Sequence, residues 1–312
     1  MRKRIAYLFL LLLFLASCRD VVVVEIEPQE EQVVIVSELS PDESIELDLS
    51  MTAEIFSGQK APRPEDATIF LSGTDLQAEA TAFIFSRNSN NYQFRNKAFR
   101  PGVGESYTLS ISIPGTDFID IQATTTIPVP LSLERAMASN QTVLKTEDGL
   151  EDILFDIELE LSDSDNLDTY VHIVPKRVLS EFNEDTNGEI TVTFFAETEP
   201  LQVLQILESH NAISELNHRD GVFVDYSKLN DQTVKLRLST TSLLDPTKDI
   251  LQNIEVTVYT LSRELFEYHQ NLHKQLINSN SSFSAPTVSF TNIENGIGVF
   301  GGMSSSSSHI KL

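Results

Sequence analysis

The chain has 312 residues, of which 46 are acidic and 22 basic, giving a formal net charge of -24 at pH 7. Such a charge repels a phosphate backbone, so the composition excludes nucleic-acid binding. Hydrophobic residues make up 41% of the sequence, which is enough for packed cores, and the length is typical of about two domains. The single cysteine, Cys18, excludes an intramolecular disulfide.

Residues 1–17 have the pattern of a signal peptide. Basic residues at positions 2–4 precede an uncharged apolar run over residues 5–16. As a helix this run spans about 18 Å, short of the roughly 30 Å hydrocarbon core, so it fits a cleaved signal better than a membrane anchor. The run ends in Leu15, Ala16, Ser17 and Cys18, which resembles a bacterial lipobox. We therefore expect Cys18 to carry lipid and to tether the mature chain to a membrane.

Residues 18–130 are expected to form an N-terminal β-sandwich. Short alternating apolar and polar runs follow one another and are separated by turn-forming residues, as in all-β sandwiches. The predicted strands cover residues 21–26, 32–37, 44–52, 67–72, 78–86, 92–95, 106–113 and 118–127. Pro128-Val129-Pro130 is a stiff, extended stretch that marks the predicted domain boundary.

Residues 131–312 are expected to form a second β-rich domain that carries one amphipathic helix. Strands are predicted at residues 153–161, 169–174, 189–196, 222–226, 233–239 and 254–261. The helix is predicted at about residues 263–277, with Ser262 as its N-cap, and residues 201–207 have weaker helical spacing. The tail from Gly296 onward is expected to supply a last edge strand.

Two motifs have a nucleotide or metal interpretation that their surroundings do not favour. Gly296, Gly298 and Gly301 satisfy G-x-G-x-x-G, but no strand–helix unit surrounds them, which indicates a glycine turn that lets the tail pack closely. His269 and His273 have zinc-ligand spacing, yet the glutamate that such sites use as a base and a third ligand are missing. We expect a core histidine and its surface neighbour, and no metal or cofactor.

Asp163, Asp165 and Asp168 form an acidic loop between two predicted strands. Their carboxylates make them weak candidates for a calcium site, since calcium takes six to eight oxygen ligands. The alternative is a solvated turn in an acidic protein. The sequence contains no G-x-S-x-G motif, no phosphate-binding loop and no cysteine nucleophile in the mature domains, so we expect a protein that is not an enzyme.

Several segments together resemble one known family. They include residues 65–69, the PGVGESYTL run of residues 101–109, the RELFEYHQNLHKQL run of residues 263–276, and residues 283–286 and 292–301. The chain is similar over nearly its whole mature length to Bacteroidota lipoproteins known as domain of unknown function 4249. The resemblance implies an immunoglobulin- or transthyretin-like N-terminal sandwich, a place in the cell envelope and an association with TonB-dependent outer-membrane receptors. It supplies no catalytic residues.

Three hypotheses of function follow. The first is an outer-membrane lipoprotein, without enzymatic activity, that acts as an accessory or ligand-capture component of a TonB-dependent uptake system. Its partners are the membrane, through the lipid, and a TonB-dependent receptor; its periplasmic or surface orientation stays open. The second is an adhesion or assembly module of the envelope without a small ligand. The third is a hydrolase with unrecognised carboxylates. The ligand and the binding loops stay open.

Overall fold

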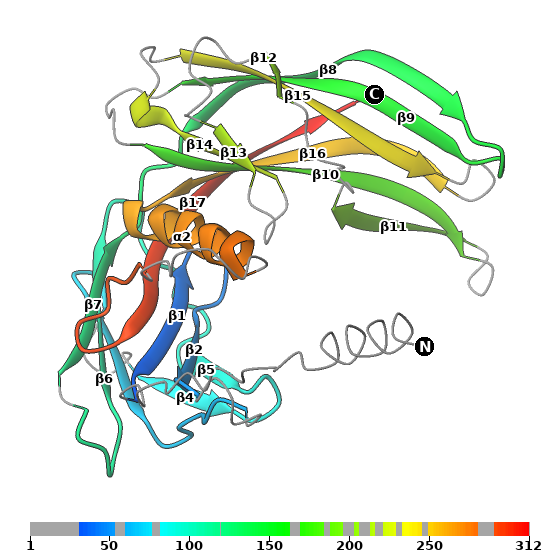
Figure 1. Ribbon diagram of the computed structural model, residues 1–312. Helices are drawn as coiled ribbons and strands as arrows, with labels where there is room; N and C mark the ends of the chain where they lie inside the picture. Colours follow the sequence, from blue (N-terminus) through cyan, green and yellow to red (C-terminus); the bar gives the residue numbers. More distant parts are fainter. Residues whose placement is uncertain are drawn as a thin grey trace, which may run out of the picture.

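The computed structural model describes residues 31–53, 60–76, 82–118, 120–162, 169–183, 188–195, 203–205, 213–215, 221–228, 233–244, 249–279 and 290–311. Within these ranges the chain consists of strands arranged in three sheets and one α-helix, α2 (Figure 1). The mainly β fold predicted from the sequence, a sandwich followed by a β-rich part with a helix, is therefore confirmed. None of the described helices is long and apolar enough to cross a membrane.

The first sandwich is built by strands from the N-terminal third of the chain. One layer contains β1 (Val33–Leu39), β2 (Glu46–Met51), β5 (Asn91–Phe94) and β4 (Phe83–Ser86), in that order. The other layer is a three-stranded sheet with the order β3 (Thr68–Gly73), β6 (Ser106–Ser112) and β7 (Ile121–Thr126). In β1, β6 and β7 every second residue is buried, as the alternating sequence pattern predicts, and the two layers enclose one core.

Several strands of the second sandwich are longer than any strand of the first. Its outer layer has the order β12 (Val203–Gln205), β15 (Thr233–Leu244), β9 (Glu151–Ser162) and β8 (Ser132–Lys145). The facing layer contains β13 (Ile213–Glu215), β14 (Val222–Asp225), β10 (Tyr170–Asn183) and β16 (Asp249–Leu261), and β11 (Gly188–Phe195) also pairs with β10. The core between them contains Phe155, Ile157 and Val256, all almost fully buried.

Pro175 lies inside strand β10, where proline is unusual because it has no N–H to donate. On one side β10 pairs continuously with β16 past this position. On the other side it pairs with β14 as far as Ile173 and with β11 from Lys176 onward. Pro175 therefore lies where one neighbouring strand has ended and the next begins, so the missing N–H costs no ladder hydrogen bond on that side.

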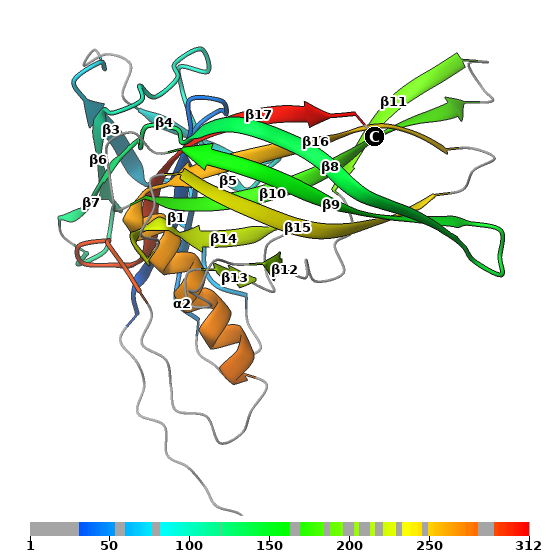
Figure 2. The same ribbon diagram turned by 90° about the horizontal axis from the view of Figure 1, so that it is seen from above.

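Strand β17 (Ile297–Ile310) connects the two sandwiches (Figures 1 and 2). Its first part, Ile297 to Gly302, runs parallel to β1, and its second part, Met303 to Ile310, runs antiparallel to β16. A single ten-stranded sheet therefore passes through both halves of the molecule. The prediction of an edge strand for the tail is wrong, because β17 has neighbours on both sides. The predicted division of the chain at residue 130 stays a prediction. Strand β17 lies after this residue and contributes to both sandwiches.

Helix α2 (Arg263–Ser279) packs on β17 where the two sandwiches meet (Figure 1). Ser262 caps the helix as predicted: its Oγ accepts a hydrogen bond from the N–H of Leu265 at 3.4 Å and a second from the N–H of Gly302 at 3.2 Å. Leu265 and Phe266 are buried, whereas Leu276 is 42% exposed. Among the described residues, the apolar stripe is therefore buried near the start of the helix and exposed at Leu276.

Two further local predictions differ from the structure. The helical spacing of residues 201–207 is not used, because residues 203–205 form strand β12 and pair with β15. Strand β8 has no counterpart among the predicted strands. Its residues are exposed or half-buried throughout, so the period-two pattern that would reveal a strand is absent from its sequence.

Candidate functional site

A groove of about 280 Å³ lies on the outer face of the β3–β6–β7 sheet, next to the loop that joins β6 to β7. Its floor contains a row of three residues that face one another across the three strands. Phe70 of β3 is opposite Ser110 of β6, and Ser110 is opposite Gln122 of β7. Because residues in register share a face of the sheet, the side chains of this row are presented together.

The rest of this face is rich in hydroxyl groups. Ser106 and Thr126 are hydrogen-bonded across β6 and β7 at 2.7 Å, and Thr108 and Thr124 at 3.0 Å. Phe70 departs from this pattern, because its side chain faces outward and is 48% exposed. Because Phe70 lies in the lining of the groove, its exposed ring is a candidate for stacking against a ligand.

One wall of the groove is provided by Phe118 and Asp120 from the β6–β7 loop. Asp120 has a positive φ of 52°, and its carbonyl oxygen accepts a hydrogen bond from Asn295 Nδ2 at 3.1 Å. The backbones of Gln122 and Glu294 exchange two hydrogen bonds, of 3.4 Å and 2.7 Å. The chain segment that leads into β17 therefore holds this side of the groove in place.

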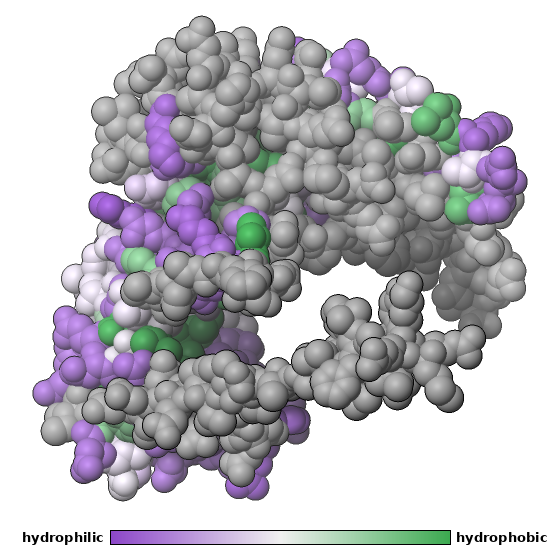
Figure 3. Space-filling view, viewed as in Figure 1, coloured by the Kyte–Doolittle hydropathy of each residue, from purple (hydrophilic) through white to green (hydrophobic). Residues whose placement is uncertain are grey.

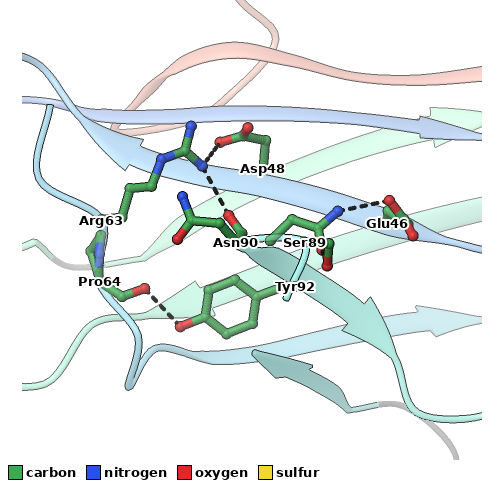
Figure 4. Close-up of polar contacts among 8 residues, drawn as sticks. Glu46, Asp48, Arg63, Pro64, Ser89, Asn90 and Tyr92 are labelled. Atoms are coloured by element: carbon green, nitrogen blue, oxygen red, sulfur yellow. Dashed lines mark hydrogen bonds and ion pairs between the residues drawn. The ribbon is translucent and has the colours of Figure 1, made fainter. Parts of the chain in front are cut away.

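A second polar cluster, on the other sheet of the same sandwich, has a structural role (Figure 4). Arg63 Nη1 contacts the Asp48 carboxylate at 2.7 Å and donates to the carbonyl oxygen of Asn90 at 3.1 Å. Tyr92 donates its hydroxyl hydrogen to the carbonyl oxygen of Pro64 at 2.9 Å, and burial raises its pKa. These contacts fasten the segment before β3 onto the sheet, so the cluster is explained without a ligand.

The buried histidines lie where helix α2 packs on the sheet, with His269 in the helix itself and His172 in strand β10. His269 and His172 both pack on Phe223, with ring centroids 5.7 Å and 4.1 Å from the phenyl ring, respectively. His269 Nε2 lies 3.6 Å from a carboxylate oxygen of Glu38 in β1. His269 is 4% exposed, as the core interpretation of the sequence predicts, and His273 is half-buried. Among the described residues no group of three or more histidine, cysteine or acidic side chains could hold a metal ion.

The sequence profile described as a domain of unknown function, DUF4249, matches residues 19–309. The chain belongs to the DUF4249 family. This membership covers both sandwiches, helix α2 and nearly all of β17, so the strand shared between the two halves lies within the matched region.

The other comparisons add no functional information about this DUF4249 chain. No curated protein matches its sequence. Among solved structures it is similar to the three N-terminal domains of the highly immunogenic outer capsid protein (Hoc) of bacteriophage RB49, with 10% sequence identity over 90% of this chain and 70% of that chain. The TM-score of 0.20 is too low for an inference about fold or function.

The site residues proposed from the sequence and the groove do not coincide. Cys18 and the acidic residues Asp163, Asp165 and Asp168 lie outside the described residues, so the lipidation site and the calcium candidates stay predictions. The groove around Phe70 was not predicted. A signal was present in the apolar run Ile69-Phe70-Leu71. Successive side chains of a strand point to opposite faces of the sheet, so if Ile69 and Leu71 face the core, Phe70 faces outward.

Proposed function

We propose that this DUF4249 protein is a non-enzymatic outer-membrane lipoprotein, anchored through Cys18, that captures a ligand as an accessory of a TonB-dependent uptake system. The groove beside Phe70 is the observation that carries the capture role. Groups that can bind a ligand by stacking and by hydrogen bonding are presented there on a rigid sheet. The lipobox-like sequence before Cys18 supports the anchor, and the family resemblance supports the receptor.

The test is crosslinking in living cells. The tagged full-length protein is crosslinked, extracted with detergent and isolated, and its partners are identified by mass spectrometry. We expect a TonB-dependent receptor as the dominant partner. The matched control is the tagged Cys18→Ala protein, which should recover much less receptor because it is no longer held at the membrane. Recovery of other envelope proteins without any receptor would contradict the uptake role.

A specific observation favours the second candidate function, an adhesion or assembly module. The β8–β9 hairpin extends well beyond helix α2 (Figures 1 and 2), and the last residues of β8 are exposed on both faces. Val143 and Leu144 near its tip are 46% and 52% exposed. Figure 3 shows hydrophobic surface between hydrophilic residues at this end of the molecule. Exposed apolar residues on a projecting hairpin are suited to contact a protein partner.

The two candidate functions make different predictions for the hairpin. If the hairpin mediates assembly, the double variant Val143→Ser, Leu144→Ser should lose its crosslinked partners while Phe70→Ala keeps them. If ligand capture is the function, the hairpin variant should keep the ligand and only the Phe70 variant should lose it. The same set of variants serves both measurements, expressed in cells for crosslinking and purified for ligand binding.

A further inference from the structure

The side chains that line the groove indicate which class of ligand it binds. Phe70 offers an exposed apolar ring, and Ser110, Gln122 and Asp120 offer a hydroxyl, an amide and a carboxylate around the same space. A ligand that uses all of them must have an apolar face and several hydrogen-bonding groups on its rim. A sugar ring has this combination: its C–H groups pack on aromatic faces, and its hydroxyl groups both donate and accept hydrogen bonds.

The position of the groove disfavours a peptide that binds through its backbone. Such peptides add to a free strand edge, where N–H and C=O groups are unpaired. The central strand of the groove floor, β6, is paired on both sides, with β3 and with β7. Along this central strand the groove floor therefore offers a ligand side chains on the face of the sheet and no unpaired strand edge.

The negative charge of the groove lining and of the whole chain restricts the class of saccharide that can bind. Among the described residues that line the groove, Asp120 is the only charged one, and the whole chain carries a net charge of -24. An acidic sugar would meet a carboxylate without a neighbouring cation in the lining, which disfavours its binding. The volume of about 280 Å³ is near the lower end of the roughly 300–1,000 Å³ that is usual for small-molecule sites, so it suits a short stretch of saccharide.

We propose that the groove binds a neutral saccharide, with one sugar ring packed on Phe70 and its hydroxyl groups hydrogen-bonded by Ser110, Gln122 and Asp120. This inference rests on the proposed capture function and names the ligand class of the same site. The sheet register and the contacts of Asn295 and Glu294 hold the floor and the wall in place before the ligand arrives, so little ordering is required on binding.

The test measures binding of the purified full-length protein to an immobilised panel of neutral and acidic oligosaccharides. The best-bound glycan is then titrated by calorimetry. We expect neutral glycans to bind and acidic ones to bind less. Phe70→Ala should weaken binding about tenfold or more, whereas Phe70→Tyr should keep it because the aromatic ring remains. Val143→Ala is the matched control, since Val143 is similarly exposed (46%) but lies in the other sandwich.

Three results would overturn the inference: no neutral glycan binds, acidic glycans bind best, or Phe70→Ala binds as tightly as the unmodified protein. Circular dichroism of the Phe70 variants shows whether they are folded, and an exposed side chain is not expected to affect folding. Failure here is distinguishable from failure of the uptake role. A protein that binds no glycan but still crosslinks to a TonB-dependent receptor would refute only the ligand class.

Discussion

Gly301 of strand β17 and Leu265 of helix α2 are in such close contact that a Cβ atom at residue 301 would lie 2.7 Å from the Cβ of Leu265. Real Cβ atoms essentially never approach so closely, so only glycine lets the helix lie this near the strand. Gly298 has a related requirement: its φ is +114°, and a Cβ there would collide with the carbonyl oxygen of Ile35. Gly298 and Gly301 thus allow strand β17 to lie close to strand β1 and to helix α2, respectively.

The Gly301→Ala variant should lower the free energy of unfolding by about 1–3 kcal/mol, because the added methyl group forces helix and strand apart. Urea unfolding measures this change. Ser307→Ala, at an exposed position of the same strand, is the control and should change stability very little. Equal stability of the Gly301 variant and the control would show that the contact is not tight in solution.

Asn292 supplies hydrogen bonds that strand β17 lacks at one point. Its Nδ2 donates to the carbonyl oxygen of Phe300 at 2.8 Å, and its Oδ1 accepts from the N–H of Phe300 at 3.0 Å. Pairing of β17 with β16 begins only at Met303, so Asn292 takes the place of a neighbouring strand at the buried Phe300. The side-chain amide therefore continues the hydrogen-bond ladder.

Asn292→Ala should cost about 1–3 kcal/mol of unfolding free energy, because two buried backbone groups lose their partners. At neutral pH, Asn292→Asp keeps the acceptor for the N–H of Phe300 but loses the donor to its carbonyl oxygen, so only one of the two hydrogen bonds is preserved. Both variants can be compared by chemical denaturation. An Asn292→Ala variant as stable as the unmodified protein would contradict this role of the side-chain amide.

Two buried tyrosines predict a loss of stability in alkaline solution. Burial, followed by the hydrogen bond to Asp75, raises the pKa of Tyr107 strongly, and burial raises that of Tyr92. In the unfolded chain both hydroxyls ionise near a pH of about 10. The folded state keeps both hydroxyls neutral. The stability that they contribute is therefore fully present below that pH and is lost as the pH rises further.

Tyr107→Phe isolates one of these groups. At pH 8 it should lower stability by about 1–3 kcal/mol, because the Tyr107 hydroxyl donates to Asp75 Oδ2 at 2.6 Å and accepts from the N–H of Gly102 at 2.7 Å. Between pH 8 and pH 11, however, the variant should lose less stability than the unmodified protein, because one ionisable group has been removed. An equally steep decline in urea-unfolding experiments would refute the role of Tyr107.

The lipid anchor predicts a simple change of location. Cys18→Ala should move the protein from the membrane fraction to the soluble fraction, because no acyl chain can be attached. Cell fractionation and immunoblotting measure this, and an outer-membrane protein serves as the fractionation control. Retention of the variant in the membrane after a high-salt wash would contradict lipidation at Cys18.

The sequence predicted those elements whose own residues contain the signal. Strands β2 and β9 alternate apolar and polar residues, and helix α2 has a cap and an apolar stripe, so each could be recognised locally. The central position of β17 could not, because it depends on pairing with β1, more than 250 residues earlier, and with β16. The groove was missed for the same reason: Phe70, Ser110 and Gln122 become neighbours only through sheet register.

The most direct measurement of the central claim is uptake by cells that lack this protein, supplied with a radiolabelled neutral saccharide that the purified protein binds. At low saccharide concentration, capture should limit uptake. We predict that the deletion slows uptake, that the unmodified protein and Phe70→Tyr restore it, and that Phe70→Ala does not. Uptake that is unchanged by the deletion, or fully restored by Phe70→Ala, would contradict a capture role for this groove.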